Sequence, residues 1–169
     1  MEFLKIVLIC VLASVGYGVV HDQFTARVCV EYFTIGHPPV FNTSSPTLLG
    51  LGWGVIATWW VGLLLGVPLA MVARLGKKPK LTARQMVPLL FRLLGFMGCL
   101  AITAGLIGYV LAMRGSIQLP DFLAAVIPPS RHVGFMADWC AHFASYFAAF
   151  VGGIILIFLN WFRRGESSE

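Results

Sequence analysis

The chain alternates between long apolar runs and shorter polar stretches. Four apolar runs cover residues 3–20, 48–73, 93–113 and 133–162. A helix that crosses the hydrocarbon core of a bilayer needs about 20 mostly apolar residues. The pattern therefore predicts four transmembrane helices within a single membrane domain, residues 1–169. Two outer loops, 21–47 and 114–132, and one cytoplasmic loop, 74–92, would join them.

The first apolar run is compatible with two interpretations. Lys5 followed by an apolar stretch is also the pattern of a secretory signal peptide. No A-x-A cleavage motif of small residues follows, because the chain continues as SVGYGVV. We therefore expect an uncleaved first transmembrane helix.

Composition supports a membrane protein. Hydrophobic residues make up 59% of the chain and charged residues 11%, whereas soluble domains carry about 25% charged residues. The net charge is +5, but the basic residues gather beside the apolar runs instead of spreading over a solvated face. This distribution argues against nucleic-acid binding and predicts the lipid bilayer as the partner.

The same basic residues predict an orientation. Five lie in residues 74–84, which contain no acid. If the amino terminus lies inside, nine lysines and arginines face the cytoplasm and three face out. Because cytoplasmic loops are enriched in basic residues, we expect a protein of the cell (inner) membrane with both termini in the cytoplasm.

Small residues recur at every fourth position of the second run. Residues four apart share one face of a helix, and small residues there let two helices approach closely in lipid. This face either packs inside one bundle, which we favour, or binds a membrane-protein partner or a second copy of the chain. The residues concerned are Gly54, Thr58, Gly62 and Gly66.

The two outward segments predict a small cap. In residues 27–35, Arg27, Cys29 and Glu31 alternate with apolar residues, a pattern typical of a half-buried strand. Residues 39–43 could return as its partner, and residues 121–127 are expected to form a surface helix. The predicted fold class is thus an all-α integral membrane protein, a four-transmembrane-helix bundle with an outer-side cap made of a short β segment and a surface helix.

Groups suited to chemistry gather on the predicted outer side. Asp138 and His142 are four residues apart and share a face of the last helix. One interpretation is a metal site that binds zinc through mixed nitrogen and oxygen ligands, with Glu31 or His37 as the general base. The alternative is an Asp–His pair that only fixes helix packing, or polar groups that only meet the solvent. The candidate ligands are His142, Asp138, His132, His21 and Asp22.

Two classes of function remain open. The favoured hypothesis is a non-enzymatic accessory or interaction subunit that docks through its outer-side cap, because no complete catalytic motif is present. The alternative is a metal-dependent, hydrolase-like enzyme that acts at the outer membrane surface on a lipid-linked substrate. Residues 21–47 and 131–145 are expected to meet, and convergence of two histidines and a carboxylate there would favour the enzyme. Cys29 and Cys140 would pair only in an oxidising compartment.

Overall fold

The computed structural model describes residues 1–166, which form helices joined by loops and contain no strand. Four segments are long and apolar enough to cross a membrane, and their surfaces expose many large apolar side chains, such as Phe96 and Phe143. Soluble monomers rarely expose such large apolar areas. The elements are α1 (Glu2–Val28), α2 (Val30–Thr34), α3 (Pro46–Ile56), α4 (Trp59–Arg74), α5 (Ala83–Met113), α6 (Asp121–Ala124), the 3-10 helix η1 (Pro129–Arg131) and α7 (His132–Glu166).

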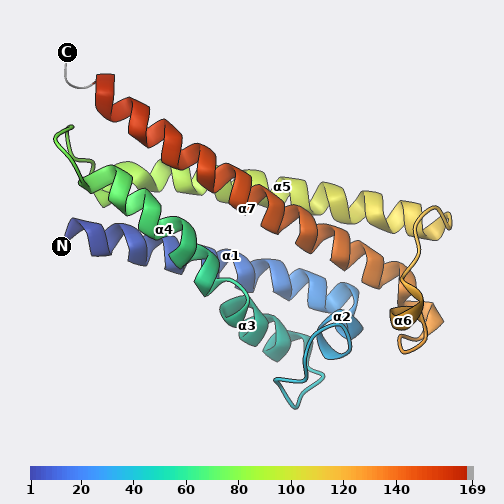
Figure 1. Cartoon of the computed structure of the whole chain (residues 1–169). Coiled ribbons are helices and arrows are strands. Elements are labelled where there is room, and N and C mark those ends of the chain that lie inside the picture. The colour runs from blue at the N-terminus through green and yellow to red at the C-terminus, as the bar shows by residue number, and fades with distance from the viewer. Residues whose placement is uncertain (167–169) are drawn as a thin grey trace.

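The long helices are arranged as two packed pairs (Figure 1). Helix α5 packs along α7, and α1 packs along α3 and α4. Contacts of α4 with α7 and of α1 with α5 join the pairs. Both termini and the α4–α5 loop lie at one end, called here the terminal end, whereas α2, α6 and the start of α3 lie at the opposite, far end (Figure 1).

The small-residue face of the second apolar run packs against α1. A Cβ atom added to Gly54 would lie 2.5 Å from the Cα of Val19, and one added to Gly62 would lie 2.7 Å from the Cα of Val11. Backbone therefore approaches backbone over most of α1. This face is covered within the chain and is not free to contact a second copy in the arrangement observed.

The second apolar run is two helices and not one. Helix α3 ends at Ile56 and α4 begins at Trp59, so the helix is interrupted in the middle of the run. Two carbonyl groups at the break accept hydrogen bonds from side chains: Ala57 from the Tyr146 hydroxyl at 3.1 Å, and Thr58 from the Ser14 hydroxyl at 2.8 Å. Such bonds make a break tolerable at membrane depth.

The prediction of a strand at residues 27–35 is wrong. Helix α1 continues to Val28, Cys29 alone is extended (φ −148°, ψ 98°), and α2 follows at once. Residues 39–43 form no strand either. A lone strand leaves its backbone groups unpaired, whereas a helix pairs them internally. Packing of Phe33 against Ala26, Leu49 and Trp53 then outweighs the β propensity of the segment.

The two segments that join helices at the far end meet, as expected. Arg131 Nε donates to Glu31 Oε1 and Oε2, both at 2.9 Å. A buried apolar cluster lies beside this ion pair and contains Cys29, Leu119, Ile127 and Phe135. Helix α6 is shorter than the predicted surface helix, because it ends at Ala124 and Ile127 turns into this cluster.

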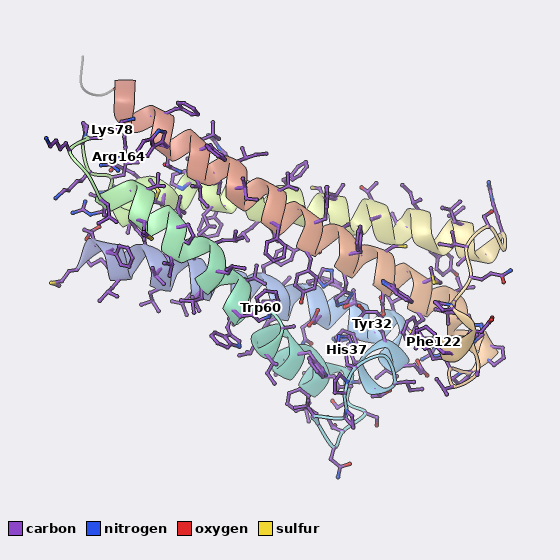
Figure 2. The ribbon with its side chains drawn as sticks, viewed as in Figure 1. Tyr32, His37, Trp60, Lys78, Phe122 and Arg164 are labelled. Atoms are coloured by element: carbon purple, nitrogen blue, oxygen red, sulfur yellow. The ribbon has the colours of Figure 1, made fainter. Side chains whose placement is uncertain are left out.

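At the terminal end, one arginine joins α7 to the end of α4 and to the α4–α5 loop. Arg164 on α7 is fully buried, and its guanidinium donates to the carbonyl groups of Val72, Leu75, Lys78 and Pro79. The last carbonyls of a helix lack partners within the helix, so Arg164 serves those at the end of α4. In Figure 2, Arg164 and Lys78 lie together at this end, while Tyr32, His37 and Phe122 lie at the other.

Candidate metal centre

Two histidines and one carboxylate converge between α1 and α7, toward the far end. One ligand atom each from His21, Asp22 and His142 lies within 4.8 Å of the other two. Asp22 Oδ1 lies 3.1 Å from His21 Nδ1 and 3.2 Å from His142 Nε2. Ligands around a tetrahedral metal with bonds of 2.0–2.2 Å lie about 3.4 Å apart. The two separations from Asp22 are close to this spacing, and the separation between the ligand atoms of His21 and His142 is at most 4.8 Å.

The orientation of His142 is fixed by a backbone carbonyl. Its Nδ1 lies 2.8 Å from the carbonyl oxygen of Asp138, one helical turn earlier. Because a carbonyl oxygen only accepts, Nδ1 carries the proton, and the neutral ring leaves Nε2, 3.2 Å from Asp22 Oδ1, with a lone pair that a metal ion can accept. Histidines that bind metals usually donate their other ring N–H in this way.

His21 and Asp22 lie side by side on α1, which does not end there. Adjacent residues of a helix point about 100° apart. His142 from α7 nevertheless reaches both: its Nε2 lies 3.2 Å from Asp22 Oδ1, and its ring meets that of His21 edge-on at 4.5 Å between centroids. His142 thus approaches between the directions in which His21 and Asp22 point.

Asp138 lies beside this cluster with one unsatisfied atom. The residue is 1% exposed, and its Oδ2 has no hydrogen-bond partner. His21 Nε2 is the other buried atom of the region without one. Buried polar groups nearly always have partners, because leaving one unsatisfied costs about 1–3 kcal/mol. Two such atoms next to three convergent ligands indicate a place for something to bind.

Aromatic rings cover the cluster on its far-end side. Tyr32 and Phe33 of α2 contact the His142 ring at 4.4 and 5.7 Å between centroids. Burial and the neighbouring Asp138 raise the pKa of the Tyr32 hydroxyl, so it remains protonated and able to donate. Helix α2 therefore screens the site from the solvent at this end.

A small polar cavity lies on the opposite side of the cluster. Its volume is about 40 Å³, and its lining includes His21, Asp22 and His142 together with hydroxyl groups at the α3–α4 break. Tyr17 and Ser145 close it with a hydrogen bond of 2.8 Å between their hydroxyls. A cavity of this kind can hold water where polar groups line it. Such water would lie next to the three candidate metal ligands.

The other candidate residues lie outside the cluster. His132 Nε2 is 2.9 Å from the carbonyl of Ile127. His37 Nδ1 is 2.7 Å from the carbonyl of Tyr32, and its ring stacks on Phe33, so Tyr32 and Phe33 stand between it and His142.

Glu31, a candidate base, is engaged by Arg131. Partial burial acts to raise the pKa of Glu31, but the hydrogen bonds and charge of Arg131 outweigh it and lower the pKa below 4.5. Neither Glu31 nor His37 is placed to serve the cluster as a base. Asp138 is the acidic group that the fold brings beside it.

The two cysteines on this side are free thiols. Cys29 packs beside Gly134 and bonds to Glu31, while Cys140 packs against Gly108 on α5. Burial raises the pKa of the Cys29 thiol to about 12, and a hydrogen bond to Glu31 adds to the rise. Cys29 therefore stays protonated, and neither thiol joins the cluster.

Sequence reasoning named every residue of the cluster but missed part of its surroundings. Tyr17 lies four residues before His21 and so on the same face of α1, a spacing that could have revealed it. The predicted strand at residues 27–35 gave no reason to place Tyr32 next to His142. Comparison of the chain with protein-family models, with curated proteins and with solved structures finds no match.

Proposed function

We propose that the chain is a zinc-dependent membrane enzyme of the hydrolase type, with its metal centre at His21, Asp22 and His142. The observation that carries the proposal is the convergence of these ligand atoms from two helices within 4.8 Å. Catalytic zinc sites have three protein ligands and keep one position open. The far end would face the outer side of the membrane, in line with the distribution of basic residues.

The surrounding residues suit hydrolytic chemistry. Zinc lowers the pKa of a bound water to about 7 and so supplies a nucleophile at neutral pH. Asp138, buried with a free oxygen, would accept the proton of that water. Tyr32 would donate a hydrogen bond to the oxygen that becomes negative, because its hydroxyl stays protonated.

Metal analysis of purified protein tests the centre. The protein, carrying an affinity tag without histidine, is reconstituted with zinc, dialysed and measured by inductively coupled plasma mass spectrometry. We expect one zinc per chain, and zinc affinity about 100-fold lower in His142→Ala and Asp22→Asn. His132→Ala is the matched control, because that histidine lies outside the cluster, and it should bind as the unmodified chain does. Equal binding by all variants would overturn the proposal.

Hydrolysis is tested on the same samples. Zinc-loaded protein in micelles should release nitrophenol from 4-nitrophenyl dodecanoate, and chelation should abolish the release. Asp138→Asn should retain zinc but lose most of the activity, typically 100-fold or more for a general base. Release that is unaffected by both chelation and Asp138→Asn would contradict the enzymatic assignment.

A second candidate function is docking of another protein through an outer-side cap formed by the two outward segments. One observation favours it: Phe122 on α6 and Val126 just after α6 are 71% and 59% exposed, and both lie outside the four apolar spans. Exposed apolar residues in that position are typical of an interaction surface. Photocrosslinking from position 122 in native membranes should capture a protein partner, whereas crosslinks to lipid alone would contradict docking.

A further inference from the structure

A second, larger cavity opens beside the metal centre. It is a groove of about 520 Å³ between α1 and α5, closed at the back by α7. Contacts between α1 and α5 are sparse compared with those between α5 and α7, so these two helices leave space between them. Its rim carries strongly exposed apolar side chains, including Phe24, Ile102 and Leu106. Because the rim lies within two spans, the groove opens sideways toward lipid.

The lining of the groove is almost wholly apolar, with two polar residues of the site at its back. His21 and Asp138 both line it, and they are the residues that hold the unpartnered buried atoms, Nε2 and Oδ2. His21 also lines the small polar cavity. The groove and the metal centre are therefore adjacent parts of one site.

The chemistry of the lining selects the occupant. Neither lysine nor arginine is found among the described residues that line the groove, so no cation there would pair with a phosphate or carboxylate head group. A carboxylate oxygen and an imidazole nitrogen are instead suited to a hydroxyl, which both donates and accepts. The long apolar walls are suited to an alkyl chain. A lipid with an uncharged, hydroxyl-bearing head group meets both conditions.

The size of the groove argues against a helix as the occupant. A helix is 10–12 Å across with its side chains, so 520 Å³ would hold only about one turn. Pockets of about 300–1,000 Å³ are typical of small-molecule sites. An extended hydrocarbon chain fits such a space without moving α1 or α5.

We propose that this groove binds the chain of a neutral, hydroxyl-bearing lipid and holds its head group against Asp138 and His21. The proposal rests on the proposed function in that it names the substrate class of the same site: an ester lipid with a free hydroxyl in its head group, entering sideways from the membrane. Binding of the lipid itself does not require the metal.

Photolabelling tests the groove directly. The probes are hexadecanol with a diazirine in its chain and the matching diazirine alkane without the hydroxyl. Each is added to the protein in phosphatidylcholine nanodiscs, with and without zinc, and labelled residues are identified by mass spectrometry. We expect the alcohol to label residues 98–109 and 20–28 about tenfold more than the alkane does, as one additional hydrogen bond to a buried polar group would give.

Two glycines of α5 provide matched variants. Gly98 lines the groove, and a Cβ added there would meet only the edge of the Tyr17 ring, at 4.0 Å. Gly98→Leu would therefore fill the groove without displacing backbone and should lower labelling about tenfold. Gly95, three residues earlier, lies in open space and does not line the groove, so Gly95→Leu should leave labelling unchanged. Asp138→Leu should remove the preference for the alcohol over the alkane.

The outcomes separate the two proposals. Labelling spread evenly over lipid-facing residues, or unchanged in Gly98→Leu, overturns the groove as a lipid site even if zinc binds normally. No labelling of the groove in the unmodified protein overturns it as well, since a partner helix would then cover the opening. Labelling that follows our expectation in a protein that takes up no zinc supports the lipid site while the proposed enzyme fails.

Discussion

The two ends of the molecule each bury charged side chains, but they treat them in opposite ways. At the terminal end, Arg164 donates to four carbonyls and is fully buried. At the far end, three residues of the site converge on one another, yet Asp138 Oδ2 and His21 Nε2 have no partner. A saturated polar group stabilises the fold, whereas an unsaturated one lowers stability and requires an explanation. Asn160 Oδ1, one turn before Arg164, is also unsatisfied, but among the described residues only at the far end do such atoms lie beside convergent ligands.

The largest expected effect is the loss of Arg164. Arg164→Met would leave the carbonyls at the end of α4 without donors, and we expect a loss of about 3 kcal/mol or more of unfolding free energy. Arg164→Lys should not restore it, because one ammonium cannot replace the planar fork of a guanidinium. Arg92→Met, at an exposed position, is the control. Thermal unfolding in detergent measures all three variants. An Arg164→Met variant as stable as the unmodified chain would contradict the stabilising role of Arg164 at the terminal end.

Removal of the unsatisfied acid at the far end should act in the opposite direction. In zinc-free protein, Asp138→Leu replaces a buried carboxylate that lacks a full set of partners with an apolar side chain of similar size. We expect a gain of about 1–3 kcal/mol in the unfolding free energy of the zinc-free protein. In the zinc-loaded protein, the same variant should lose hydrolytic activity. Thermal unfolding in the presence of a chelator measures the gain. A loss of stability there would show that Asp138 serves the fold and not the site.

The smallest expected effect concerns the ion pair that holds the two far-end segments together. The folded-state pKa of Glu31 is lowered below 4.5 by Arg131, despite partial burial. Its contribution is therefore present above the unfolded-state pKa and is lost as the pH falls through the lower folded-state value. Because Arg131 is 42% exposed, the contribution should stay below about 1 kcal/mol.

Thermal unfolding from pH 7 to pH 3 measures this contribution. Glu31→Gln should be slightly less stable than the unmodified chain at neutral pH, and the two should converge in acid. High salt should reduce the difference as well, because screening weakens exposed pairs. A difference that grows as the pH falls would contradict the assigned sign.

The sequence by itself determined the four apolar helical segments, since their length and composition leave the backbone no other way to satisfy its hydrogen bonds in lipid. It also named His21, Asp22, Asp138 and His142 as candidates. It failed at residues 27–35, where a period of two suggested a strand. So short a pattern cannot outweigh the packing of Phe33 in the core of the far end.

Only the tertiary structure decided which candidates meet. The spacing of 120 residues between Asp22 and His142 carries no signal in one sequence, and their 3.2 Å approach depends on how α7 packs against α1 and α4. The break at Ala57 and Thr58 also had no local marker, because hydroxyl groups from α1 and α7 are what make it tolerable. Periodicity along a chain reports which face of each helix is buried, but contacts between helices depend on their relative position, which the fold alone defines.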